Sequence, residues 1–236
     1  KHSFHNNHHR WFVDHLILYI RHCLIVLSID RPLLDYRQKS LDGLNQNVKN
    51  LGFNVSPITP NEISIEKLQQ FDAVILGIRA FNVVDELKYK NKILFQYVEK
   101  GGNLIIQYNT TNNLVTKEIA PYELILSRDR VTDENAKVTF LSPSHKVLNQ
   151  PNKITEKDFT GWVQEQGLYY PNKWSSEFIP ILASNDEGES SKTGGLVIAK
   201  FGKGNYIYTG LSFFRELPEG VSGAYRLLAN MIALDK

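Results

Sequence analysis

The first half of the chain is built from short apolar runs that alternate with amphipathic segments. The apolar runs cover residues 23–30, 53–58, 72–78 and 103–108. They contain few polar positions, as is typical of strands that are covered on both faces of a sheet. Strands of this kind that alternate with helices predict an α/β fold, in which a mostly parallel sheet carries helices on both faces.

The amphipathic segments between these runs predict three helices. The apolar residues of the first helix, over residues 38–53, share one stripe: Leu41, Leu44, Val48 and Leu51. Gly52 is a natural stop for it. Ser64 can cap a short helix over residues 64–71, and Asp85 can cap a longer one over residues 86–100.

The second half of the chain has a different pattern. Residues 111–194 are irregular, with short strands expected at 122–127 and 136–142, and they predict a β-rich insertion. Residues 196–211 hold two runs of strand formers around Gly202-Lys203-Gly204, which indicates a β-hairpin. Because Gly-Lys-Gly joins two strands, we interpret it as a hairpin turn. A phosphate-binding loop would instead lie at the start of a helix. An amphipathic helix over residues 222–234 closes the chain.

The amino-terminal segment, residues 1–22, lacks this order and is rich in His and Asn. We interpret it as a flexible arm or an artificial extension, so that residues 23–236 form a single domain. The alternative is a metal site shared by His5, His8 and His9. No signal peptide is recognisable at the start. A signal on a longer precursor would give a periplasmic or secreted protein, and otherwise the protein would be cytoplasmic.

Composition excludes several classes of partner and site. The formal net charge of +2 is too close to balance to indicate a nucleic-acid partner, and Lys and Arg are spread along the chain. No uninterrupted apolar segment reaches the roughly 18 residues that span a bilayer. Cys23 is the only cysteine, so neither an intrachain disulfide nor a cysteine zinc cluster can form. We therefore expect no metal, no cofactor and no membrane span.

Candidate chemistry is concentrated in the loops that follow the strands. Ligands of open α/β sheets bind beyond the carboxyl ends of the strands, in the crevice there. The loops after residues 72–78, 103–108 and 205–211 deliver the candidate ligand-binding residues: Arg79, Tyr108, Asn109, Thr110, Ser212, Phe213 and Arg215. This mixture of amide, hydroxyl, guanidinium and aromatic groups suits a sugar or a small carboxylate. Alternatively, the two arginines pair with Asp85, Glu86 or Glu216 inside the protein.

No catalytic set is apparent. The sequence has no G-x-S-x-G turn, and His145 stands alone in a turn, where a structural or solvated role is more typical than that of a general base. Alternating charges at residues 127–134 indicate a salt-bridged surface loop. The alternative there is that Arg128 or Arg130 binds an anion.

Three segments, residues 71–110, 126–171 and 194–232, resemble the carboxyl-terminal region of bacterial LmbE-like proteins, large relatives of the N-acetylglucosaminyl deacetylases of the PIG-L family. That region is similar to class I glutamine amidotransferases and to ThuA-like proteins. The resemblance covers roughly residues 53–236 and implies a flavodoxin-like sheet. It also implies that a zinc-dependent deacetylase domain would lie upstream of this chain.

The resemblance bears on catalysis as well. In active amidotransferases the strand equivalent to "NLIIQYN" leads into a G-x-C-x-G nucleophile turn, and a His-x-Glu pair lies near the carboxyl terminus. This chain has Gln107, Tyr108, Asn109 and Thr110 at the first place, and "GLSFFRE", without histidine, at the second. We therefore expect a non-catalytic accessory domain that binds a carbohydrate-type ligand or supports an attached deacetylase domain. The alternatives are a carbohydrate hydrolase with other catalytic groups and a purely structural interaction domain.

Overall fold

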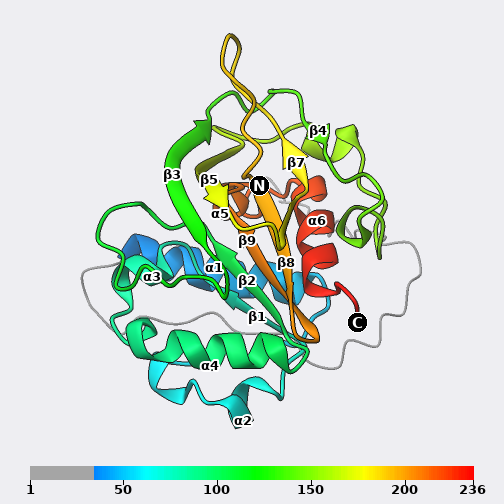
Figure 1. Cartoon of the computed structure of the whole chain (residues 1–236). Helices are drawn as coiled ribbons and strands as arrows, with labels where there is room; N and C mark the ends of the chain where they lie inside the picture. The colour runs from blue at the N-terminus through cyan, green and yellow to red at the C-terminus, as the bar shows by residue number, and fades with distance from the viewer. Residues whose placement is uncertain (1–34) are drawn as a thin grey trace, which may run out of the picture.

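The computed structural model describes the backbone of residues 35–236 and the side chains of residues 43–236 (Figure 1). The arm over residues 1–22 and the strand expected at 23–30 lie outside the described residues. The helices are α1 (Asp35–Asn50), α2 (Ile65–Leu68), α3 (Ala80–Val83), α4 (Leu87–Glu99), α5 (Phe213–Glu216) and α6 (Ser222–Ile232). Short 3-10 turns occur at Pro60–Glu62, Lys146–Leu148 and Glu156–Phe159.

The strands are β1 (Ala73–Leu76), β2 (Asn103–Gln107), β3 (Leu124–Val131), β4 (Thr139–Phe140), β5 (Gly167–Trp174), β6 (Phe178–Pro180), β7 (Leu182–Ala183), β8 (Leu196–Phe201) and β9 (Gly204–Thr209). Five of them form the main sheet, in the order β1-β2-β9-β8-β6. β1, β2 and β9 run parallel, with Ile105 paired to both Ile75 and Ile207. β8 is antiparallel to its neighbours β9 and β6.

The expectation of a mostly parallel sheet is therefore wrong for the described residues, where two pairings are parallel and two are antiparallel. The hairpin β8–β9 reverses the chain without a crossover helix, and β6, from the insertion, then adds to its free edge. A buried strand reads as a continuous apolar run whichever way its neighbour points, so the pattern of apolar residues could not reveal this direction.

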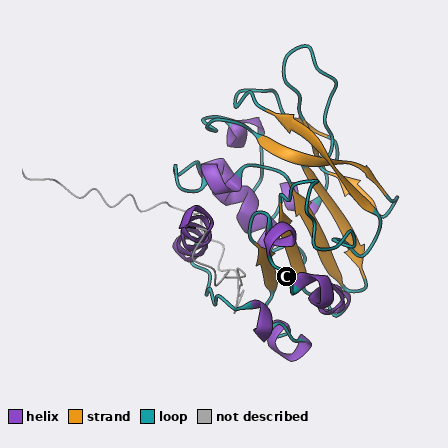
Figure 2. Ribbon diagram, turned by 90° about the vertical axis from the view of Figure 1, so that its left-hand side faces the viewer, coloured by secondary structure: helices purple, strands orange, loops and turns teal. Residues whose placement is uncertain are grey.

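Helices do cover both faces of the sheet, as expected (Figure 2). On one face, the side chain of Asn103 donates hydrogen bonds to the carbonyls of Ile232 and Leu234 at the end of α6, at 3.0 and 2.8 Å. On the other, Tyr206 packs edge-on against Phe95 of α4, with ring centroids 6.4 Å apart. The two helices thus pack on opposite layers, because side chains alternate between the faces along a strand.

Most of the local signals in the sequence are confirmed. Gly52, at φ 90°, follows the end of α1, and the Ser64 hydroxyl accepts a hydrogen bond from the backbone N–H of Lys67, at 3.2 Å, to cap α2. The N-cap of α4 is Glu86, which makes no side-chain capping bond, so the cap expected at Asp85 is wrong. Residues 53–58 form no strand beyond a single bridge residue at Ile58. Pro57 lacks the N–H that a strand ladder needs.

The segment 111–194 contains β3 to β7 and is β-rich, as expected. β3 and β5 form a long antiparallel ribbon that lies across one end of the main sheet (Figure 1). The shorter pair, β4 and β7, lies beside it. The insertion thereby places residues 163–170 next to the loops that follow β9.

Candidate functional site

The loops that follow β1, β2 and β9 meet at one edge of the sheet. These three strands are parallel, so their carboxyl ends lie together, as expected for a ligand site of an open α/β sheet. Two of the loops are joined by backbone and side-chain hydrogen bonds. The N–H of Arg79 donates to the carbonyl of Tyr108 at 2.7 Å, and the side chain of Asn82 both accepts from the N–H of Thr110 and donates to its carbonyl, at 2.9 and 3.1 Å.

Asn109 occupies the centre of this junction. It is fully buried, and its Oδ1 accepts a hydrogen bond from the backbone N–H of Phe81 at 2.8 Å. Its Nδ2 donates to the carbonyl of Gln107 at 2.9 Å, and its backbone N–H donates to the hydroxyl of Tyr208 at 3.2 Å. Both ends of the amide are therefore engaged: Oδ1 joins the two loops, and Nδ2 braces the end of β2.

Arg79 has an unusual backbone and an unusual side chain. Its φ and ψ of 57° and 22° lie in the left-handed region, which non-glycine residues adopt at a cost of about 1–2 kcal/mol. Its Nε is buried and has no hydrogen-bond partner among the residues that the structure describes. Left-handed residues that are held in place by their surroundings tend to cluster at functional sites. Here Tyr169, at φ 52°, and Gln164, at φ 66°, are two more such residues from the insertion.

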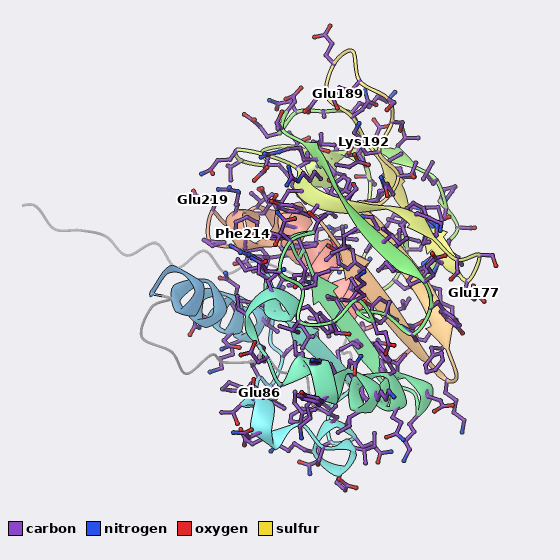
Figure 3. All side chains as sticks on the ribbon, turned by 60° about the vertical axis from the view of Figure 1, so that its left-hand side comes forward. Glu86, Glu177, Glu189, Lys192, Phe214 and Glu219 are labelled. Carbon is purple, nitrogen blue, oxygen red and sulfur yellow. The ribbon has the colours of Figure 1, made fainter. Side chains whose placement is uncertain are left out.

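An aromatic stack adjoins Arg79. Tyr108 and Tyr169 are stacked, with ring centroids 6.0 Å apart and an interplanar angle of 11°. Phe214 also packs against this pair, 5.3 Å from Tyr108, and the guanidinium carbon of Arg215 lies 4.8 Å from the centre of its ring. Figure 3 shows Phe214 near Glu219, at the outer side of the α5 region. Tyr169 and Phe214 are half-buried and offer partly open aromatic surface.

The remaining residues expected at the site are closed off from solvent or engaged. Ser212 is fully buried, and Phe213 packs on Trp162 with 1% of its surface exposed. The aromatic neighbour of Tyr108 is therefore Phe214 instead of Phe213. The hydroxyl of Thr110, which is half-buried, donates to the carbonyl of Asn112 at 3.1 Å.

Arg215 belongs to an internal ion-pair cluster. Its guanidinium donates to Glu165 at 3.0 Å and also to the side chain of Gln164. Arg130 binds the other oxygen of Glu165 at 2.5 Å, and the Glu165 side chain is only 4% exposed. The alternative role of Arg215, an internal salt-bridge partner, thus describes its contacts, and the acid is Glu165 of the insertion instead of Glu216.

Glu216 is the most perturbed carboxyl group near the site, although the sequence marked it only as a possible partner for an arginine. It is fully buried, and its Oε2 accepts a hydrogen bond from the N–H of Val163 at 3.0 Å. Its Oε1 has no hydrogen-bond partner within the described part of the chain. Burial raises the pKa of Glu216 from 4.5 to about 7. The pattern F-F-R-E gave no sign of this, because Val163, whose N–H binds the carboxylate, lies 53 positions away in the sequence.

His145 serves the local backbone. Its Nδ1 accepts a hydrogen bond from the N–H of Val147 at 3.1 Å and caps the turn Lys146–Leu148. Burial lowers the pKa of His145, in keeping with an imidazole that accepts at Nδ1. In the part of the chain that the structure describes, no three His, Cys, Asp or Glu side chains gather closely enough to hold a metal ion. No helix there is long and apolar enough to cross a bilayer.

A small hollow adjoins the aromatic stack. It is lined by Leu44, Asn47, Phe213, Phe214, Leu217 and Pro218, from α1 and the α5 region. Its enclosed volume is only about 10 Å³, which is about the space that one water molecule needs. The hollow is therefore too small to enclose a ligand.

Solved structures with the same fold include three from bacteria and archaea. A ThuA-like protein from Bacteroides uniformis has 14% identity and a TM-score of 0.58, over 96% of each chain. A cytoplasmic protein from Salmonella typhimurium has 15% identity and a TM-score of 0.55, over 80% of this chain and 84% of its own. A GMP synthase-like protein from Thermoplasma acidophilum has 10% identity and a TM-score of 0.53, over 88% and 90%.

The chain has a class I amidotransferase-like, ThuA-like fold. At these identities the likeness concerns the fold alone. No family model matches the sequence, and no curated protein does. Within this fold the loop after β2 departs from a nucleophile turn, which is sharp and strained. Tyr108, Asn109 and Thr110 are not among the residues with positive φ.

Proposed function

We propose that this chain is a non-hydrolytic amidotransferase-like domain that binds a carbohydrate-type small molecule at the edge where β1, β2 and β9 end. We call this surface the carboxyl-edge site and define it by Arg79, Tyr108, Thr110, Tyr169 and Phe214. The observation that carries the proposal is the replacement of nucleophile chemistry by binding chemistry. At the position that resembles the nucleophile turn of amidotransferases, Asn109 is fully buried and hydrogen-bonded. The preceding residue, Tyr108, begins the aromatic stack, and its carbonyl binds the N–H of Arg79, whose Nε has no partner among the described residues.

Physical arguments support a sugar as the class of ligand. Half-buried aromatic rings give a flat apolar surface, and a few fixed polar groups beside it can orient a hydroxylated ring. The loops are held by a network of hydrogen bonds, so the side chains are positioned before a ligand arrives. Such preorganisation lowers the cost of binding.

The resemblance to LmbE-like proteins supports an accessory role beside an N-acetylglucosaminyl deacetylase domain that precedes this region. It also supports a flavodoxin-like strand order. In that order β1, β2 and β9 would be the last three strands of the parallel set.

A hydrolase is the second candidate, and Glu216 is the observation in its favour. A carboxyl group with a pKa near 7 is typical of a general acid. A general acid must reach the substrate, however, and Glu216 has no exposed surface. We therefore favour binding over hydrolysis.

Two measurements on the full chain test the proposal. Calorimetric titration with glucose, galactose, N-acetylglucosamine and glucuronate should detect binding of at least one sugar, and an ammonia-release assay with glutamine should show no turnover. Phe214→Ala should weaken sugar binding, because it removes one ring of the stack. Tyr89→Ala, on a 75% exposed ring of α4, should leave binding unchanged. Ammonia release that disappears in Cys23→Ala would overturn the non-hydrolytic assignment, and no binding of any sugar at millimolar concentration would overturn the binding role.

A further inference from the structure

Arg79 differs from the other arginines near the site in its hydrogen-bonding. Arg130 and Arg215 both pair with Glu165, and Arg226 pairs with Asp158 at 2.7 Å. The Nε of Arg79 is buried without any partner in the described part of the chain. A buried donor that is left unpaired is destabilising, because it has given up its hydrogen bonds to water. A ligand with an acceptor at this point would remove that cost.

The position of Arg79 is fixed on both sides. Its own N–H is bound to the carbonyl of Tyr108, and two residues further along the N–H of Phe81 is bound to Asn109. Asn82 adds hydrogen bonds to the carbonyls of Thr110 and Asn112, at 3.1 and 2.9 Å. These bonds hold Arg79 in a left-handed backbone conformation that is unfavourable for a non-glycine residue by itself.

The aromatic stack begins at the same place. Because the backbone N–H of Arg79 binds the carbonyl of Tyr108, the backbone of Arg79 lies beside that of the residue whose ring stacks on Tyr169. A guanidinium presents a planar fork of N–H donors that matches the oxygens of a carboxylate or a phosphate. A half-buried arginine with an unpaired donor and the residue that begins the aromatic stack are therefore neighbours at this edge of the sheet.

We propose that the ligand of the carboxyl-edge site is an acidic sugar, whose oxyanion pairs with Arg79 while its ring lies against the aromatic stack. This inference rests on the proposed function. It adds that the ligand is negatively charged and that Arg79 binds its charged group. A neutral sugar would lack the oxyanion that pairs with the guanidinium of the half-buried Arg79, so we expect the site to discriminate in favour of the anion.

Titration calorimetry of the full chain with four probes tests the ligand class. Glucuronate carries a carboxylate, glucose 6-phosphate carries a phosphate, glucose carries neither, and acetate carries the anion without a ring. We expect at least one of the two acidic sugars to bind at least about tenfold more tightly than both glucose and acetate. The stronger of the two identifies the oxyanion. Equal affinity for glucose and the acidic sugars would overturn the inference but leave the proposed function standing, whereas binding of none of the probes would overturn both.

Arg79→Gly tests the residue. Glycine adopts the left-handed backbone without strain, so the variant should fold, and melting curves check this. Loss of a charge-assisted hydrogen bond of about 1.5–3 kcal/mol predicts a roughly 10- to 150-fold loss of affinity for the acidic sugar, with little change for glucose. Arg79→Lys keeps the charge without the planar fork of donors. Its affinity for the acidic sugar should therefore lie between those of the unmodified chain and of Arg79→Gly. The matched control is Arg128→Gln, an exposed arginine on β3, which should bind as the unmodified chain does. Unchanged preference for the acidic sugar in folded Arg79→Gly would overturn the inference.

Discussion

Replacement of Glu216 by glutamine should make the protein more stable at high pH and leave it nearly unchanged at low pH. Glu216 is fully buried, and a single hydrogen bond from the N–H of Val163 compensates its carboxylate. Glutamine has nearly the same shape and can accept the same bond, but it never carries a charge. The variant therefore isolates the free energy of holding that charge in the fold.

The pKa gives the magnitude. Burial raises the pKa of Glu216 from 4.5 to about 7, and the carboxylates of Glu219 and Glu134 add to the rise. The N–H of Val163 and the guanidinium of Arg215 oppose it. Each pKa unit corresponds to about 1.4 kcal/mol, so the full shift corresponds to an upper value of about 3 kcal/mol. Relaxation of the fold around the charge would lower the measured value to about 1–3 kcal/mol.

The sign follows from proton binding. Between pH 4.5 and about 7 the folded protein keeps the proton on Glu216, whereas the unfolded chain has lost it. The contribution of this group to stability is fully present below pH 4.5 and is lost as the pH rises through about 7. Urea unfolding of the unmodified chain and of Glu216→Gln at about pH 5, 6, 7 and 8 should therefore give a difference that grows with pH in favour of the variant.

The difference between the two proteins removes other titrations from the comparison. Burial lowers the pKa of His145, which also makes stability depend on pH, but both proteins share that contribution. Glu118→Gln is the matched control because its side chain is exposed, and surface substitutions usually change stability by less than about 0.5 kcal/mol. A difference for Glu216→Gln that stays constant from about pH 5 to pH 8 would refute the reasoning.

Two further substitutions test the packing. Gly102→Ala should lower stability by about 1–3 kcal/mol or more, because its new Cβ would lie 2.1 Å from the buried ring of Tyr97, whereas Gly43→Ala meets open space in α1 and should not destabilise the protein. Equal urea midpoints for these two variants would contradict the packing argument. Asn230→Leu should cost about 2–4 kcal/mol, since its buried side chain accepts from the N–H of Asn152 and donates to two carbonyls. A loss below about 0.5 kcal/mol would show that water replaces these bonds.

The local architecture was largely readable from the sequence. The hairpin over residues 196–211 appears as β8 and β9, and the run "NLIIQ" forms β2 with five buried residues. The closing helix is α6. These elements combine strong local propensity with a single possible burial pattern. In such cases the local sequence pattern and the tertiary packing favour the same secondary structure.

Only part of the β3–β5 ribbon could be predicted from the sequence. β5, at Gly167–Trp174, was not expected, and β3 runs four residues beyond the predicted strand end at residue 127. Three register shifts interrupt their pairing, so neither strand keeps the alternation of apolar and polar residues that identifies a half-buried strand. Pro171 within β5 further weakens the signal.

Arg79 and Arg215 show why candidate site residues could be found in the sequence but not distinguished. Both arginines follow strands that end at the same edge of the sheet, so sequence position alone predicts the same role for both. Glu165, which pairs with Arg215, lies 50 residues earlier in a segment without a clear pattern, and only the β3–β5 ribbon brings it there. The side chain of Arg215 is thereby engaged in holding the insertion against α5, whereas the Nε of Arg79 has no partner in the described part of the chain. Hydrogen-bond partners thus distinguish Arg215, which stabilises the site, from Arg79, which we propose as the ligand contact.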